Sequence, residues 1–218
     1  MILDLIDGGS ALVVLGGTCV ATVLRCGRGE LAITLRALAA LPQHRFIADH
    51  ARAELAPQVR AIQQDGLLRA PVRHVGDADF DDATDALIHD RTIESLLAAH
   101  DRHKARRLAD ADSAVRVLAQ AAELAPVFGM AGTLIALNRM ARVPLDGGTA
   151  MTGAIGMAVL TTLYGILVAN LVLAPLARAI ERAAGAEEME RQKVMDWLAG
   201  QVEAVCPHTG RRTLKTTV

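Results

Sequence analysis

The sequence predicts an all-α integral membrane protein with three transmembrane helices and a helical cytoplasmic domain. Three stretches without charge predict the helices that cross the membrane: residues 8–24, 124–137 and 147–177. At about 1.5 Å per residue, the last of these forms a helix longer than the ~30 Å of a hydrocarbon core. Leu, Ala and Val supply most of the apolar residues and aromatic residues only 2%, a composition typical of helical proteins rather than of sandwiches or barrels.

Charge and motif content exclude several classes of function. The formal net charge is −1, whereas binding of nucleic acid phosphates needs a clustered basic excess. The three cysteines lie far apart without a CxxC motif, so neither a disulfide framework nor a zinc site is indicated. The sequence contains no arrangement typical of a catalytic nucleophile and no phosphate-binding glycine motif. We therefore expect no catalytic residues, no metal site, no enzymatic activity and no nucleic acid partner.

The first predicted transmembrane helix covers residues 8–25. Its uncharged run ends at Arg25 and is followed by Arg28. A secretory signal peptide has the opposite order, with basic residues before the apolar run and a cleavage site after it. We therefore expect a retained membrane helix; a buried helix of a soluble protein is the alternative.

A polar middle region, residues 26–117, is predicted to form the cytoplasmic helical domain. Apolar residues at helical spacing indicate several amphipathic helices. We expect breaks near Pro57, Gly66, Pro71 and Gly76. The histidines lie among charged residues, and no zincin-type carboxylate accompanies the closest pair, so solvated helix faces are expected for them. These histidines are His74, His89, His100 and His103.

The remaining chain is predicted to form a membrane hairpin and a tail. We expect a transmembrane helix over residues 119–137, a periplasmic loop over 138–148, a transmembrane helix over 149–177 and a cytoplasmic helical tail over 178–218. Glu123 lies near the start of this hairpin and is expected at the membrane interface. Basic residues concentrate in the middle region and after residue 177. By the positive-inside rule these two parts face the cytoplasm, and the N-terminus faces the periplasm.

The predicted hairpin offers hydroxyl groups but no ionisable group at its centre. An ion carrier usually has an ionisable residue such as Asp, Glu, Lys or His near mid-membrane, and residues 124–137 and 147–177 contain none of these four. If this chain conducts ions, a partner must bring that group, and the chain itself would contribute Thr133, Thr161 and Thr162. The alternative is that each threonine hydroxyl simply bonds to a backbone carbonyl one turn earlier.

Two segments of the predicted hairpin carry specific motifs: APVFGMAGTLIAL at residues 125–137 and AIGMAVLTTLYGILVANLVLAP at residues 154–175. They resemble the two signature helices of the MotA stator family, which is related to the TolQ and ExbB proteins. LIDGGSALVVLGGTCVAT at residues 5–22 and VRAIQQDGLLRAP at residues 59–71 resemble two further elements of the family, in the same order. MotA has four spans and this chain begins near the second. A lost first span, an upstream start codon and a natural three-span form like ExbB and TolQ are the alternatives.

The resemblance implies a stator subunit of the bacterial inner membrane that drives flagellar rotation. Such subunits form a homo-oligomeric ring, expected to be a pentamer, around a MotB-like single-span protein whose membrane aspartate carries a proton or, alternatively, sodium. No other cofactor is expected, and the flagellar rotor protein is a further partner. The family pattern places Thr133 and Thr162 opposite the partner's carboxylate, with Thr161 beside them. It also makes Pro126 and Pro175 coupling prolines, and Arg60 a rotor-facing residue.

Two other functions remain open at this level. One is an ExbB- or TolQ-like energiser of envelope transport. The other is a degenerate paralogue that assembles as a scaffold without conducting ions. The threonine and glycine motifs of the hairpin are more similar to those of MotA than to those of ExbB and TolQ, which favours the flagellar role.

Overall fold

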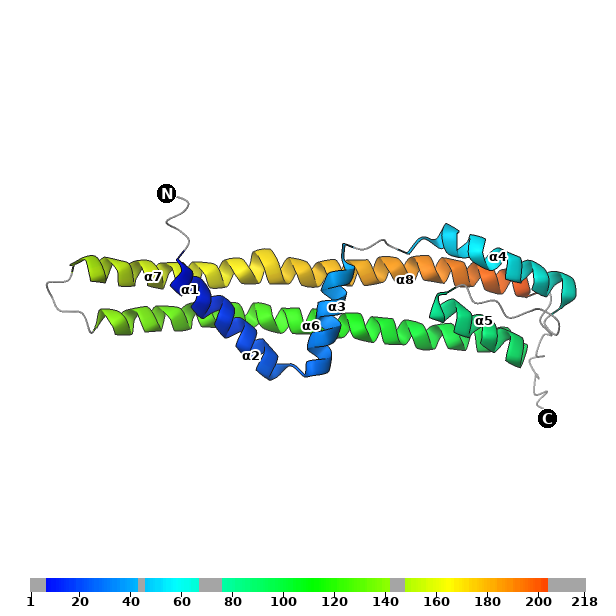
Figure 1. Cartoon of the computed structure of the whole chain (residues 1–218), viewed down its shortest axis with the longest axis horizontal. Coiled ribbons are helices and arrows are strands. Elements are labelled where there is room, and N and C mark those ends of the chain that lie inside the picture. Colours follow the sequence, from blue (N-terminus) through cyan, green and yellow to red (C-terminus); the bar gives the residue numbers. More distant parts are fainter. Residues whose placement is uncertain (1–6, 43–45, 67–75, 142–147, 204–218) are drawn as a thin grey trace, which may run out of the picture. The chain divides into compact units, whose positions relative to one another are not determined.

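A computed structural model of the chain describes residues 7–42, 46–66, 76–141 and 148–203 (Figure 1). All regular structure in these residues is helical, which confirms the predicted all-α class. The first segments are α1 (Gly8–Ala11), the π-helical η2 (Leu12–Gly16), α2 (Gly17–Arg25) and α3 (Arg28–Ala40). They are followed by α4 (Ala48–Asp65), α5 (Ala78–Asp90), α6 (Ile93–Met140), α7 (Gly148–Leu167), the π-helical η3 (Val168–Leu173) and α8 (Ala174–Val202).

Three helical stretches among the described residues are long and apolar enough to cross a membrane. They lie within Gly8–Arg25, Ile93–Met140 and Met151–Val202. Helix α6 continues through the predicted boundary between the middle region and the second transmembrane helix. The limits of the predicted spans and domains therefore remain predictions, because no feature of the helices marks where the membrane ends.

Local sequence explains where several helices begin and end. Asp7 caps α1, since its side chain accepts hydrogen bonds from the backbone N–H groups of the first turn. Gly66 ends α4 with a φ of 75°, a left-handed conformation that glycine adopts readily. The break near Gly66 is thus confirmed. The break expected at Pro57 is wrong, because Pro57 lies inside the continuous helix α4; Pro71 lies outside the described residues.

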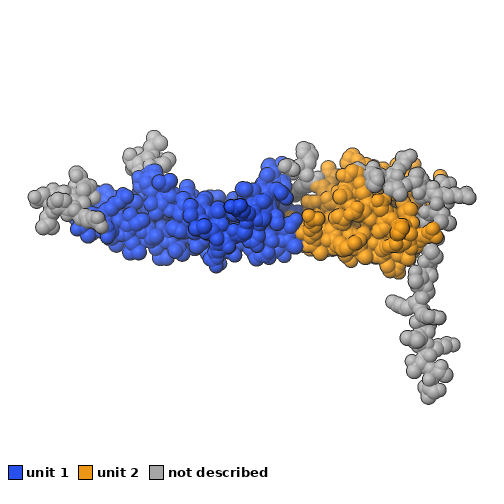
Figure 2. Space-filling model, turned by 60° about the horizontal axis from the view of Figure 1, so that its bottom comes forward, with its two compact units in different colours: residues 1–43, 109–183 blue, residues 44–108, 184–218 orange. Residues whose placement is uncertain are grey.

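The chain divides into two compact units (Figure 2). Unit 1 comprises residues 1–43 and 109–183, and unit 2 comprises residues 44–108 and 184–218. Helices α6 and α8 contribute residues to both units. The apolar contacts of unit 1 include a cluster in which α3, α6 and α8 meet, formed by Ala37, Leu38, Ala114, Leu118, Ala177 and Ile180.

Unit 2 has a larger apolar core, to which α4, α5, α6 and α8 contribute. Its largest fully buried side chains are Leu55, Ile62, Phe80, Leu87, Leu96, Met195 and Leu198. The ring of Phe80 also stacks on Phe46, with 5.7 Å between the ring centroids. Burial of this apolar surface drives the folding of unit 2 in water.

Candidate functional site

The candidate site lies in unit 1, where α6 and α7 touch through glycines. A methyl group added at Gly132 would lie 2.6 Å from Cγ2 of Thr161. One added at Gly129 would lie 2.9 Å from the carbonyl oxygen of Thr161, and one added at Gly165 would lie 2.7 Å from that of Ala125. No side chain fits at these positions without a shift of the helices. Small residues permit such close backbone approach between helices in lipid.

This contact brings the two predicted threonine segments together. Thr133 directly follows Gly132 on α6, and Thr162 on α7 lies beside Gly129, whose added methyl group would be 3.3 Å from the Thr162 Cα. Both threonine side chains are half-buried in the isolated chain. The structure therefore places their hydroxyls on facing helices at the edge of one close contact.

Each of the two hydroxyls donates its hydrogen bond to its own helix. Thr133 Oγ1 donates to the carbonyl of Met130 at 2.6 Å, and Thr162 Oγ1 donates to the carbonyl of Ala158 at 3.3 Å. A hydroxyl has one proton to donate and two lone pairs that accept. With the proton directed to the backbone, both hydroxyls are left as acceptors, which suits a cation or the O–H of a protonated carboxylic acid.

Thr161 is fully buried in the contact between α6 and α7. Its side chain packs against Gly132, and its hydroxyl donates to the carbonyls of Met157 and Ala158 at 3.0 and 3.1 Å. In the isolated chain this hydroxyl has no exposure, whereas Thr133 and Thr162 are partly accessible. Burial of Thr161 follows from its glycine neighbours on the other helix, which sequence periodicity does not reveal.

The two predicted coupling prolines occupy different settings. Pro126 is half-buried within α6 and close to α7, since a methyl group on Gly165 would lie 3.1 Å from its Cα. Pro175 is exposed and is the second residue of α8, directly after the π-helical segment η3. Both helices continue through their proline, but proline has no backbone N–H, so each removes one hydrogen-bond donor from its helix.

The first membrane helix packs on both members of the hairpin. Gly17 lies against the ring of Phe128 on α6, with no room for a larger side chain. The backbone N–H of Asp7 donates to the Tyr164 hydroxyl on α7 at 3.2 Å. The segment from α1 to α2 thereby supports the glycine contact from one side.

Arg60, the predicted rotor-facing residue, belongs to unit 2. It is exposed on α4, whereas its neighbours Val59 and Ile62 are buried in the core of the unit. The side chain is consequently available to a partner. The segment that follows it, residues 67–75, lies outside the described residues.

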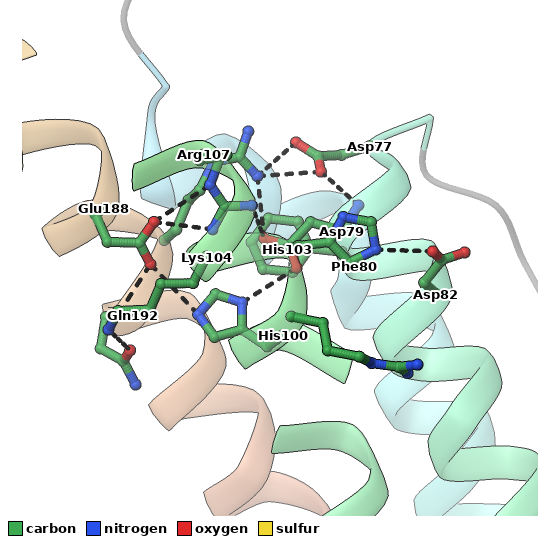
Figure 3. Close-up of polar contacts among 12 residues, drawn as sticks. Asp77, Asp79, Phe80, Asp82, His100, His103, Lys104, Arg107, Glu188 and Gln192 are labelled. Carbon is green, nitrogen blue, oxygen red and sulfur yellow. Dashed lines mark hydrogen bonds and ion pairs between the residues drawn. The ribbon is translucent and has the colours of Figure 1, made fainter. Parts of the chain in front are cut away.

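Unit 2 contains a buried polar cluster that the sequence did not predict (Figure 3). The expectation that the histidines lie on solvated faces is wrong for His100, whose side chain is 1% exposed. It lies between Asp79, 3% exposed, and Glu188, 11% exposed. Arg107 bridges both carboxylates, at 2.7 Å from Asp79 and 2.9 Å from Glu188. His89 is exposed and His103 half-exposed; His74 lies outside the described residues.

Paired charges explain why this cluster can be buried. Burial alone raises the pKa of the Asp79 carboxyl, but the hydrogen bonds and charges of His100 and Arg107 outweigh it and hold that pKa below its usual value. His100 and Arg107 lie 21 and 28 residues away from Asp79 along the chain, so no local motif reveals these pairs. Among the described residues, no group of three or more His, Cys, Asp or Glu side chains is placed to hold a metal ion.

Comparison with known proteins decides the family. The model of the MotA/TolQ/ExbB proton channel family matches residues 62–193, more than half of the chain. The chain belongs to this family. The resemblance seen in the motifs is thus confirmed. With three candidate spans, this member of the MotA/TolQ/ExbB family is a multi-pass protein of the bacterial inner membrane.

Two of the similar proteins carry names from motility and chemotaxis. The chain is 30% identical over 139 residues to Motility protein A of Cereibacter sphaeroides, a match that covers 63% of this chain and 54% of that protein. It is 25% identical over 196 residues to the chemotaxis protein PomA of Vibrio alginolyticus, covering 88% and 76%. The solved structure of C. jejuni MotAB has the same fold, with a TM-score of 0.80, 17% identity and coverage of 93% and 80%. The match thus spans about half the length of Motility protein A.

Proposed function

We propose that this chain is a MotA-like stator subunit that forms an ion channel with a MotB-like partner and converts ion flux into torque on the flagellar rotor. The observation that carries the proposal is the α6–α7 contact, which presents the acceptor hydroxyls of Thr133 and Thr162 at its edge. Family membership over residues 62–193 and the motility relatives support it. An ExbB- or TolQ-like role is not favoured, because the named relatives serve motility or chemotaxis.

The ion pathway needs an acid from the partner. Residues 124–137 and 147–177 contain no ionisable group except Tyr164, so the carrier carboxylate comes from a single-span helix with a membrane aspartate. In its protonated state that acid donates to the free lone pairs of Thr133 or Thr162. A proton is the ion of this scheme, with sodium as the alternative. The place of Thr161 in the pathway stays a prediction, and its burial gives it a packing contact as well.

Coupling to the rotor would proceed through the two prolines and unit 2. Pro126 and Pro175 lack the N–H that would rigidify their helices, which makes them suitable hinges between the ion site and the rest of α6 and α8. Arg60 is exposed and offers a charge to the rotor protein. We place the N-terminus in the periplasm, unit 2 in the cytoplasm, and the chain in a homo-oligomeric ring, expected to be a pentamer.

Replacement of the hydroxyls by isosteric methyl groups tests the ion pathway. In a motor-null strain complemented with this chain and its partner, Thr133→Val or Thr162→Val should abolish swimming while the partner still co-purifies. Thr22→Val is the matched control, since Thr22 is a buried membrane threonine on α2 that also donates to its own helix, at 2.7 Å. Normal swimming with both hydroxyls replaced would overturn the proposed pathway. An equal loss of swimming in Thr22→Val would show that the substitutions cause a general packing defect instead.

A further inference from the structure

Asn170 carries the one amide side chain in the uncharged stretch of residues 147–177. It lies eight residues after Thr162 and eight residues before Arg178, the first charged residue on the side that the proposed topology places in the cytoplasm. At about 1.5 Å per residue, Asn170 is roughly 12 Å along the helix from each of them. A polar group thus lies halfway along the part of the span that an ion has to cross after it leaves the threonine site.

Burial shows which face of the helix carries Asn170. Thr161, Gly165 and Ala169 follow one another at spacings of four residues and are all buried, so this column of residues faces the rest of unit 1. Asn170 directly follows Ala169, just as Thr162 directly follows Thr161. Asn170 and Thr162 therefore project from the same side of the buried column, and both are at least partly exposed in the isolated chain.

The side chain of Asn170 is held by its own helix. It lies in the π-helical segment η3, after which the backbone N–H of Ala174 bonds to the carbonyl of Ala169, five residues earlier. Nδ2 of Asn170 donates to the carbonyl oxygen of Ile166 at 2.9 Å, whereas Oδ1 accepts no hydrogen bond from the described residues. Segments of π-helix often occur at functional sites, and this one presents a free acceptor on an exposed helix face.

A free amide oxygen does not suit a surface that is covered by lipid. The exposed side chains around Asn170 are apolar: Ile166, Leu167, Leu171 and Val172. Lipid matches these side chains, but it offers no donor to the amide oxygen, and a polar group without a partner in hydrocarbon is costly. A donor therefore faces Asn170 in the assembled protein. Water is the donor expected there, because Asn170 shares its helix face with a threonine of the proposed ion pathway.

We propose that Asn170 is the next polar step of the ion pathway and binds a water molecule between the threonines and the cytoplasm, a role that rests on the proposed function as an ion channel. The amide takes up no proton itself. Its oxygen accepts a hydrogen bond from the water, and the ion passes along this water. The bond from Nδ2 to the Ile166 carbonyl restricts the side chain, so that Oδ1 stays available to the water.

Access of water to residue 170 tests this role in the complex of the chain with its partner. The native cysteines are replaced by alanine, and Asn170→Cys is compared with Leu171→Cys in inverted membrane vesicles, which expose their cytoplasmic face. The probe is a small cationic methanethiosulfonate. Asn170→Cys should react about tenfold faster than Leu171→Cys, because the reactive thiolate forms in contact with water and hydrocarbon excludes water. Equal rates would overturn the proposal, since they are the result for a residue that faces lipid or another copy of the chain.

Swimming of the complemented motor-null strain provides a second measurement. Asn170→Leu has a similar volume but no amide, and should lower swimming speed about fivefold while the partner still co-purifies. Asn170→Thr should swim faster than Asn170→Leu, because its hydroxyl can donate to the Ile166 carbonyl and still accept from water. Leu171→Ile is the matched control and should swim normally.

The threonine variants separate a failure of this step from a failure of the proposed function. Normal swimming of Asn170→Leu, together with loss of swimming in Thr133→Val and Thr162→Val, would overturn the role of Asn170 and leave the proposed pathway at the threonines intact. Normal swimming of the threonine variants as well would overturn both.

Discussion

The two units hold their helices together in opposite ways. In unit 1, α6 and α7 meet where side chains are absent, at Gly129, Gly132 and Gly165. In unit 2, the helices meet through large buried side chains and paired charges. Lipid is as apolar as a leucine side chain, so membrane helices gain from close backbone contact, whereas unit 2 gains from removal of apolar surface from water. A larger side chain at the helix contact should therefore destabilise unit 1, and a smaller side chain in the core should destabilise unit 2.

Loss of a core ring in unit 2 should have the largest effect. Phe80→Ala removes a fully buried side chain and its stacking on Phe46, at a cost of about 4 kcal/mol. The single tryptophan, Trp197, packs against the same core, so its fluorescence during urea unfolding of the full chain measures this unit. Met189→Ala, at a 64% exposed position, is the control and should change the unfolding free energy by less than about 0.5 kcal/mol. A small effect of Phe80→Ala would contradict the assigned core.

Removal of one buried charge should have the next largest effect. Asp79→Asn leaves His100 and Arg107 without their shared carboxylate and should cost about 3 kcal/mol by the same fluorescence measurement. The control Asp82→Asn alters a carboxylate that is 62% exposed, and should be nearly neutral. Equal effects of the two variants would show that burial of the pair is not what stabilises unit 2.

The same carboxylate predicts sensitivity to acid. Because the folded state lowers the pKa of Asp79, the ionised form stabilises unit 2 above the unfolded value of about 4, and this stabilisation is lost as the pH falls through the lower folded value. Urea unfolding between pH 5 and pH 3 should show a smaller decline for Asp79→Asn than for wild type. Parallel declines would contradict the role of Asp79.

Added volume in unit 1 should destabilise the hairpin by about 2 kcal/mol. Gly165→Ala places a methyl group 2.7 Å from the carbonyl oxygen of Ala125, which is backbone and has to shift. Gly156→Ala on the same helix is the matched control, because nothing lies within 4 Å of its added methyl group. The fraction of chain that stays folded after heating in detergent, measured by size-exclusion chromatography, should fall only for Gly165→Ala. Equal survival of both variants would refute the close helix contact.

A change of cation without a change of charge should have the smallest effect. The guanidinium of Arg191 lies 4.5 Å from the Phe46 ring centroid and pairs with Asp77 at 2.9 Å. Arg191→Lys keeps the charge but loses the planar stacking and the fork geometry, for a cost of about 1 kcal/mol. Arg182→Lys, at an exposed position, should leave the unfolding free energy unchanged. An unchanged unfolding free energy in Arg191→Lys would show that a positive charge alone accounts for the contribution of residue 191 to stability.

The sequence predicted those features that depend on neighbours in the chain. Uncharged runs predicted the three candidate spans, and the glycine at residue 66 predicted a helix end. The cluster of Asp79, His100 and Glu188 could not be predicted, because its members come from three helices. In its local sequence each of them resembles a charged surface residue. The burial of Thr161 escaped for a similar reason, since it depends on Gly132 of the other helix. Pro57 does not end its helix: α4 continues through it and buries Leu55 and Val59, on either side of it, in the core of unit 2.

The central claim is that this hairpin works only around an acid supplied by another polypeptide. Its most direct test is purification of the chain from bacterial membranes together with the proteins bound to it, followed by mass determination of the intact complex. We predict a detergent-dependent complex with several copies of this chain, expected to be five, around a partner with an aspartate in its span. Recovery of the chain alone, or from the aqueous fraction without detergent, would contradict the account.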